Sequence, residues 1–328
     1  MKRILFLAGY AVDSFSITQI ISKHRILKEF ISPEKVRDRA QILYLCYILT
    51  INSILFLYAL IHNFCFKVCK KKDIFYLLIV SFWPLYSILS SNRLDLLFLM
   101  AIFIYLLYFF FNMKNGKPVM VRRRIFKLGS KLLIVFFIFF ILLTIFMGRR
   151  NTFADIHVQD YLTKYISAGI RNFDLFVKEP HDTDGWGKET FPSIYRFIYT
   201  HFGYGEYYKV PLEFRKIKGI SLGNIYTGFR RYYSDFGVFG LMVIPFILGL
   251  LMNSLYYKAK KLCKNNMLGF EILLFAYLSR CLFLMPIEDQ FFIFEFSARG
   301  LFKILVLYIL YCLFIKKKMV FIHRIKNV

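Results

Sequence analysis

The residues best suited to chemistry stand together between Gly223 and Asp235, directly before a long apolar run that begins at Phe236. Their side chains could hold a charged, sugar-bearing ligand, and they are Asn224, Tyr226, Thr227, Arg230, Arg231, Tyr232, Tyr233, Ser234 and Asp235. In a helix, Thr227, Arg231, Ser234 and Asp235 would form one stripe, because they fall at i, i+4, i+7 and i+8. Arg231 and Asp235 would lie one turn apart and could pair.

Motifs of the well-known hydrolases, nucleotide-binding proteins and metalloproteases are missing from the chain. It contains no GxSxG, P-loop, HExxH or glycine-rich dinucleotide sequence. The six cysteines lie in or beside apolar runs, and Cys65 and Cys69 lack a second ligand pair nearby, so neither a disulfide framework nor a metal site is indicated. We therefore expect chemistry that needs no metal and no cofactor.

The block from Asn224 to Gly249 resembles the signature of bacterial oligosaccharide repeat-unit polymerases, the Wzy-type O-antigen and capsule polymerases. The resemblance is carried by Asn224-Ile225-Tyr226-Thr227, Phe229-Arg230, Tyr233, Asp235-Phe236-Gly237, Gly240, Pro245 and Gly249. It implies a multi-spanning glycosyltransferase that joins polyprenyl-pyrophosphate-linked repeat units outside the cytoplasmic (inner) membrane. The alternative interpretation of the block is structural: interfacial tyrosines followed by a bend at Asp-Phe-Gly.

Such a transfer needs cations for the departing pyrophosphate and a base for the acceptor hydroxyl. Arginine suits the first task because it binds phosphate oxygens in pairs, and Asp235, Glu206, Glu213 and Asp289 are the candidate bases. The resemblance favours Arg230 and Asp235 as the catalytic residues, because both stand in the family-like block. The expected substrate-binding residues are Arg93, Arg150, Asn224, Tyr226, Thr227, Arg231, Tyr233 and Arg280. Arg93 and Arg150 stand where apolar runs end. Arg280 lies inside an apolar run, where a charge is costly and usually faces a polar interior.

Composition assigns the chain to the membrane proteins. Of its 328 residues, 58% are hydrophobic and 20% are aromatic. We therefore expect an all-α, polytopic membrane protein. The net charge of +25 comes from short basic clusters between apolar runs, which indicates topology signals and no nucleic-acid partner. The expected partners are the lipid-linked oligosaccharide, membrane lipids, a chain-length regulator and a flippase.

Seven apolar runs are predicted to span the membrane, and Met1 to Ile21 is a weaker eighth. They are Ile42 to Ile61, Ile74 to Ser91, Leu96 to Phe111, Leu132 to Met147, Phe236 to Tyr257, Met267 to Pro286 and Ser297 to Ile315. Alternating topology puts four basic clusters on one side, near residues 67–72, 114–131, 258–264 and 316–326, which the positive-inside rule assigns to the cytoplasm. The basic segment from Ser22 to Arg39 does not fit this pattern.

The chain is therefore expected to have three parts: spans at 1–147, an extracytoplasmic loop at 148–235, and spans at 236–328. The loop is too long to be structureless. Its apolar residues recur at helical spacing from Tyr161 to Phe173, where Glu179-Pro180 ends the pattern, and again from Phe191 to Phe202. We expect a large helical loop above the membrane.

Two other classes of function remain open at this point. A flippase or transporter of lipid-linked oligosaccharides would also need a cationic cavity between spans, although alternating-access transporters usually show internal repeats and none is apparent here. A structural or assembly subunit of an envelope complex is the third class.

Overall fold

The computed structural model describes residues 19–20, 40–66, 71, 73–89, 94–115, 158–179, 186–204, 212–217, 220–264 and 268–316. The chain divides into two compact units, which we describe separately. The first comprises Met1–Asp155 with Cys263–Asn266, and the second comprises Ile156–Leu262 with Met267–Val328. The second unit thus combines most of the expected outer loop with the C-terminal spans.

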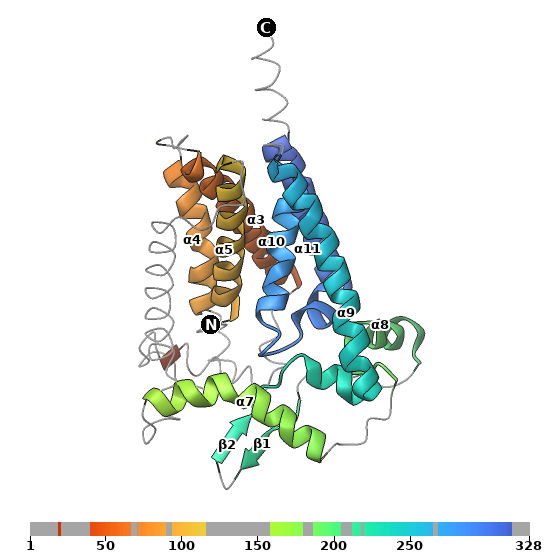
Figure 1. Ribbon diagram of the computed structural model, residues 1–328. Helices are drawn as coiled ribbons and strands as arrows, with labels where there is room; N and C mark the ends of the chain where they lie inside the picture. Colours follow the sequence, from red (N-terminus) through yellow and green to blue (C-terminus); the bar gives the residue numbers. More distant parts are fainter. Residues whose placement is uncertain are drawn as a thin grey trace. The chain divides into compact units, whose positions relative to one another are not determined.

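The described part of the first unit is a bundle of three apolar helices, α3 (Ala40–Cys65), α4 (Asp73–Leu89) and α5 (Leu94–Asn115), drawn from red to yellow in Figure 1. Polar and aromatic contacts fix their packing. The Ser53 hydroxyl lies 3.0 Å from the carbonyl oxygen of Ile79, which joins α3 to α4. The rings of Tyr58 and Phe110 meet edge to face at 5.1 Å, which joins α3 to α5.

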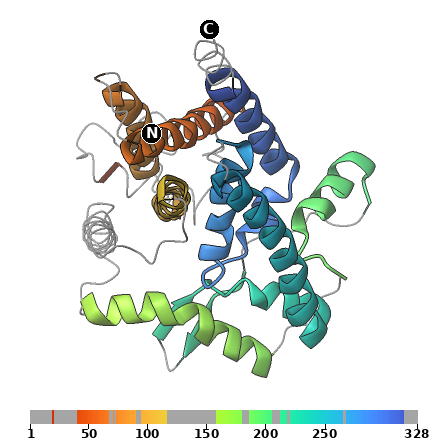
Figure 2. The same ribbon diagram turned by 45° about the horizontal axis from the view of Figure 1, so that its top comes forward.

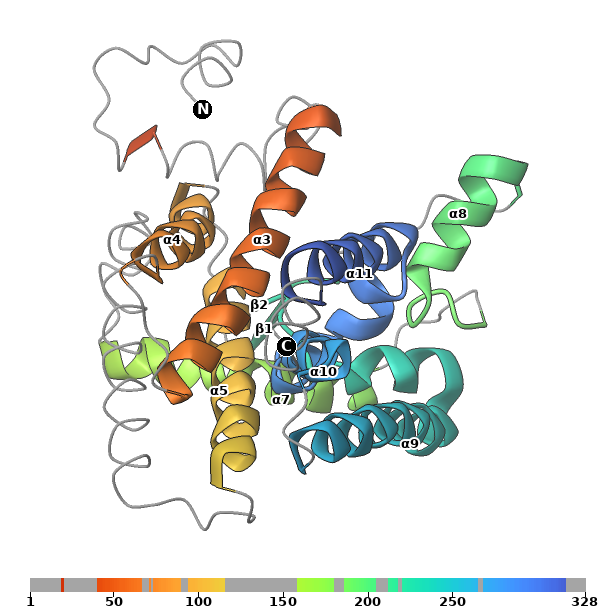
Figure 3. The same ribbon diagram turned by 90° about the horizontal axis from the view of Figure 1, so that it is seen from above.

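The second unit is mainly helical, and Figure 3 shows its helices from above. Its elements in chain order are α7 (Val158–Lys178), α8 (Pro192–Phe202), β1 (Arg215–Ile217), β2 (Ile220–Gly223), α9 (Phe229–Lys264), α10 (Phe270–Phe283), the π-helical turn η3 (Phe291–Glu295), α11 (Ala298–Tyr311) and η4 (Cys312–Lys316). The two expected loop helices are therefore confirmed as α7 and α8. The antiparallel hairpin of β1 and β2 was not expected.

The protein is an all-α, multi-pass membrane protein. Within the described residues, four helical segments are long and apolar enough to cross a membrane: Cys46–Cys65, Leu94–Phe111, Phe229–Cys263 and Ala298–Lys316. The predicted runs at α4 and α10 form shorter helices of 17 and 14 residues. Leu132 to Met147 and nearly all of Met1 to Ile21 lie outside the described residues.

A sharp bend at Gly237 separates the polar start of α9 from its apolar body. Gly237 has a φ of 61° and a ψ of −148°, in the region that glycine alone adopts readily, and the first turns leave the long straight part at an angle (Figure 2). At ~1.5 Å per residue the 36 residues of α9 span roughly 54 Å, well beyond the ~30 Å of a bilayer core. The bend allows Phe229 to Phe236 to lie outside the hydrocarbon.

Labelling at the two ends of α9 tests this topology. Trp186 is 81% exposed and its ring lies 5.3 Å from that of Phe236, at the bend, whereas Lys261 belongs to the basic cluster at the other end. In a variant without its own cysteines, Trp186→Cys should react with a membrane-impermeant maleimide in intact cells. Lys261→Cys should react only after permeabilisation. Equal labelling of both, or the reverse pattern, would contradict the topology.

Candidate functional site

The centre of the candidate site is Arg230, in the first turn of α9. Its guanidinium is only 2% exposed and forms ion pairs with Glu189 and Glu213, the latter at 3.0 Å. It also stacks over the ring of Phe176 from α7, with its central carbon 4.0 Å from the ring centroid. One arginine thus ties together α7, α9, the turn before α8 and the segment before β1, which suits a group that holds the fold together.

The β1–β2 hairpin brings Glu213 and Arg215 to this point. The hairpin reverses the chain, so that Glu213 meets Tyr226, whose hydroxyl donates to the Glu213 carboxylate at 2.9 Å. Burial, followed by the negative charge of Glu213, raises the pKa of Tyr226, and the hydroxyl therefore stays protonated as a donor. Arg215 lies 3.6 Å from the same carboxylate.

A second set of contacts fastens the turn that contains Glu189 and Thr190. Both carboxylate oxygens of Asp235 accept hydrogen bonds from that turn, from the backbone N–H of Glu189 at 3.2 Å and of Thr190 at 2.6 Å. Arg231 donates to the carbonyl oxygen of Glu189 at 3.2 Å. Phe236 packs between Trp186 and Phe191. The Asp-Phe-Gly sequence therefore binds the loop and bends the helix, as the structural interpretation of the block expects.

Two carboxylates follow α10 and face the first turns of α9. Glu288 is 30% exposed at its side chain, and its Oε1 lies 3.9 Å from Nη2 of Arg231. Burial raises the pKa of Glu288, and the nearby charge of Arg231 opposes the rise. Asp289 is fully buried, and its carboxylate accepts from the backbone N–H of Phe291 at 2.9 Å and of Phe292 at 3.1 Å. Glu288 is the more accessible group and is suited to exchange protons with a ligand.

Burial raises the pKa of Asp289 to about 6, although the backbone N–H groups of Phe292 and Phe291 and the Tyr232 hydroxyl favour the ionised form. The folded protein therefore binds more protons than the unfolded chain between the unfolded pKa of 3.8 and about 6. Because of this difference, the free energy of unfolding should fall as pH rises through that window.

Asp289→Asn should remove this dependence, because the amide oxygen can still accept from the backbone but cannot ionise. Relative to the variant, the wild type should lose about 2 kcal/mol between pH 4 and pH 6. Melting temperatures of the purified proteins at several pH values measure the difference, with the exposed Glu179→Gln as the control. Parallel curves for wild type and Asp289→Asn would contradict the assignment.

Two glycines allow α7, the start of α9 and the segment after α10 to approach one another closely. A Cβ on Gly169 would lie 2.7 Å from the carbonyl oxygen of Pro286, and a Cβ on Gly228 would overlap the sulfur of Met285. The backbone N–H of Gly228 donates to the carbonyl oxygen of Met285 at 2.8 Å. Asn172 of α7 donates to the carbonyl oxygen of Ile225 at 2.8 Å. The segment after α10, the start of α9 and α7 therefore pack backbone to backbone.

The charges of this cluster favour acid–base chemistry over anion binding. We use the name arginine–carboxylate cluster for eight residues: Glu189, Glu213, Arg215, Arg230, Arg231, Asp235, Glu288 and Asp289. Three arginines face five carboxylates in it, so an added pyrophosphate would meet an excess of negative charge. It is a framework of ion pairs in which Glu189 and Asp289 are buried and Glu213, Asp235 and Glu288 are half-buried; of these three, Glu288 makes the longest contact with an arginine, at 3.9 Å.

The two residues expected to be catalytic, Arg230 and Asp235, both lie in this cluster, but their contacts are those of structural residues. Direct contact of either with a ligand stays a prediction. Thr227 precedes α9, which begins at Phe229, so the expected helical stripe that included it is wrong.

The expected substrate-binding residues are only partly brought together. Asn224 is half-buried after β2. Arg231 is buried in the arginine–carboxylate cluster, and Tyr226 is buried beside it, where its hydroxyl contacts Glu213. Tyr233 packs edge to face on Phe173 at 6.0 Å. Arg93 and Arg150 lie outside the described residues.

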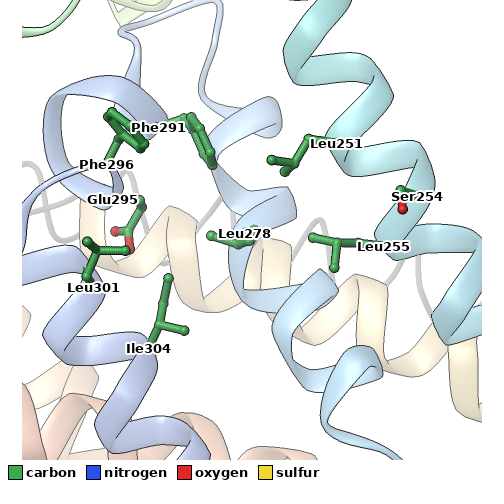
Figure 4. A pocket seen from close by; sticks show the side chains of 9 residues that line it. All are labelled: Leu251, Ser254, Leu255, Leu278, Phe291, Glu295, Phe296, Leu301 and Ile304. Carbon is green, nitrogen blue, oxygen red and sulfur yellow. The ribbon is translucent and has the colours of Figure 1, made fainter.

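Arg280 of α10 is placed elsewhere in the same unit, in a buried ion pair with Glu295 of η3. The hydroxyl of Tyr277 donates to the other oxygen of Glu295 at 2.8 Å. Glu295 is also part of the wall of a pocket of about 520 Å³ between α9, α10, η3 and α11. Figure 4 shows its lining, which is Leu251, Ser254, Leu255, Leu278, Phe291, Glu295, Phe296, Leu301 and Ile304. Most of this wall is hydrocarbon, and Arg280 neutralises its one carboxylate.

The expected site did not include Glu189, Glu288 or Glu295, all of which contact an arginine. Of these residues, only Glu288 could have been predicted from sequence, because Glu288-Asp289 is an acidic pair between two apolar runs, where a charge needs a partner. The others pair with arginines through tertiary contacts that sequence spacing does not reveal.

Comparisons with protein-family models, with curated proteins and with solved structures find no match to this chain, so its function is argued from the geometry of the second unit.

Proposed function

We propose that the protein is a membrane glycosyltransferase that polymerises polyprenyl-pyrophosphate-linked oligosaccharide repeat units on the outer face of the bacterial cytoplasmic membrane. The observation that carries the proposal is the course of one short segment, residues 288–296. Its first residue, Glu288, belongs to the arginine–carboxylate cluster, whereas Phe291, Glu295 and Phe296 belong to the pocket wall. A polar site and an apolar site joined in this way suit a ligand with a sugar head and a hydrocarbon chain.

In this proposal the pocket receives part of the polyprenyl chain. Its walls come from α9 and α11, which are long and apolar enough to span the membrane, and from α10 and η3. Both oxygens of its only carboxylate are already engaged, by Arg280 and Tyr277. A mostly apolar lining whose one charged group is already paired favours a hydrocarbon ligand over a water-soluble one.

Glu288 is the proposed general base. It takes the proton of the acceptor sugar hydroxyl as that oxygen attacks the anomeric carbon of the growing glycan. The bond from that carbon to the pyrophosphate breaks, and polyprenyl pyrophosphate leaves with the bonding electrons. A carboxylate whose pKa is raised is the stronger base near neutral pH, and Arg231 is the positioning residue beside it.

The departing pyrophosphate requires cations, but Arg215, Arg230 and Arg231 already face carboxylates in the arginine–carboxylate cluster. The expectation from sequence that Arg93 and Arg150 bind substrate stays a prediction, because neither lies within the described residues.

Removal of the gene separates this proposal from the flippase alternative. Loss of a polymerase should leave single repeat units on the cell surface and abolish the ladder of longer glycans on a gel. Loss of a flippase should abolish the single units too, since nothing would reach the outer face. A full ladder in the deletion strain would reject both.

A further inference from the structure

We propose that α8 lies in the membrane–water interface, with its apolar face among the lipid acyl chains next to the headgroups. The partner is the bilayer itself, and the proposal does not depend on the enzymatic function. The helix has two unlike faces: Ile194, Ile198 and Phe202 recur at i, i+4 and i+8, while Arg196 and Thr200 lie opposite. Such a pattern is typical of helices that lie on membranes.

The apolar face of α8 is uncovered in the structure. Ile194 is 40% exposed, Phe202 64%, and Phe197, which borders the same face, 51%. Tyr199 and Tyr204 are exposed as well, and aromatic side chains of this kind concentrate at membrane interfaces. On the polar face, Arg196 and Thr200 bond to the backbone of their own helix, Arg196 Nε at 3.3 Å and Thr200 Oγ1 at 2.7 Å.

The start of α8 is fixed at the level where a span begins. The Ser193 hydroxyl lies 2.9 Å from the carbonyl oxygen of Ile293 in η3, and Phe191 packs edge to face on Phe292 at 5.2 Å. The turn η3 leads directly into α11, whose N-terminus is capped by the Ser297 side chain. The helix therefore leaves the protein at the end of a membrane span.

The direction of α8 agrees with an interfacial position. Figure 1 shows α8 running across the direction of the upright helices α9 and α11, and Figure 3 shows it extending outward from them. With 11 residues it is roughly 16 Å long, too short to cross ~30 Å of hydrocarbon. A short helix lying across the spans at their ends occupies the plane of the interface.

We assign lipid to the apolar face of α8 because this face is continuous with exposed apolar side chains of the neighbouring membrane segment. Phe294 and Phe296 of the η3 region and Leu301 of α11 are exposed where α8 is attached. These side chains belong to a segment that enters the membrane, so the bilayer lies against the N-terminal end of α8. Its uncovered face extends this surface sideways.

Tryptophan quenching by brominated lipids tests the proposal in the full-length protein. Trp83 and Trp186, the two natural tryptophans, are replaced by Phe, and single tryptophans are introduced as Phe202→Trp or Thr200→Trp in nanodiscs. Phe202→Trp should lose more than half of its emission, with bromines near the headgroups quenching more than bromines deep in the chains. Thr200→Trp, on the polar face, should lose less than a fifth.

Leu305→Trp, at an exposed position of α11, is the positive control and should be quenched most by deep bromines. Phe197→Trp is a second reporter of the apolar face if Phe202→Trp does not fold. Equal quenching of the two faces, or no quenching on either while Leu305→Trp responds, would overturn the proposal. An unquenched, blue-shifted Phe202→Trp signal would assign the face to a protein contact instead.

Discussion

Glu288→Gln is expected to reduce polymer formation at least about 100-fold while the protein still folds and inserts. The amide keeps the size of the side chain and its place beside Arg231, but it cannot take a proton from the acceptor hydroxyl, and removal of a general base typically costs 10²- to 10⁴-fold in rate. The measurement is the initial rate of glycan elongation with purified wild type and variant. The melting temperature shows whether each is folded.

Glu179→Gln is the matched control, because this glutamate is 83% exposed and only reaches Arg215 at 4.0 Å. Its elongation rate should stay within twofold of the wild type. If Glu288→Gln elongates at the wild-type rate, Glu288 is not the base. In that case Asp235, the carboxylate expected from sequence, would be tested next.

Arg230→Ala is expected to lower the stability of the protein by about 3 to 5 kcal/mol. Without the guanidinium, the buried carboxylate of Glu189 loses its cation, whereas Glu213 keeps Arg215 at 3.6 Å, and a buried charge left without its partner is strongly destabilising. For a protein of this size the loss corresponds to a fall in melting temperature on the order of 10 °C. Fluorescence-detected thermal unfolding in detergent measures it.

Two further variants separate this structural role from direct binding of a phosphate by Arg230. Arg171→Ala removes an exposed ion pair with Asp174, 3.0 Å long, on α7, and should change the melting temperature by no more than 1 to 2 °C. Arg230→Lys keeps the charge but loses both the stacking over Phe176 and the paired contacts, so its melting temperature should lie between wild type and Ala. If Arg230→Ala melts like the wild type and only loses activity, the structural role is wrong.

The helices of the second unit could be predicted from sequence because their signals are local. Pro180 ends the apolar pattern of α7, and Pro192 at the first turn starts α8 within a residue of the expected position. The long apolar run of α9 indicates a span by length alone. The hairpin escaped prediction because its strands have only three and four residues, too few for alternation to show.

The site was harder to predict because its pairs are distant in sequence. Arg230 is expected from sequence to bind phosphate, but in the structure it pairs with Glu189 and Glu213, which stand 41 and 17 residues away, and Glu288 stands 57 residues from Arg231. Spacing along one helix shows neighbours at i+3 and i+4 only. It therefore suggested Asp235 as the partner of Arg231, whereas the Asp235 carboxylate accepts hydrogen bonds from the backbone of the loop.

The most direct test of the proposed function is to incubate the purified protein with one defined polyprenyl-pyrophosphate-linked repeat unit and to separate the products by size. A polymerase should yield a regular ladder of glycans, each longer by one repeat unit, with release of polyprenyl pyrophosphate and no requirement for a nucleotide sugar. The ladder should be absent with Glu288→Gln and present with Glu179→Gln. A substrate that stays a single unit with folded wild-type protein, across lipid compositions, would contradict the proposed polymerase function.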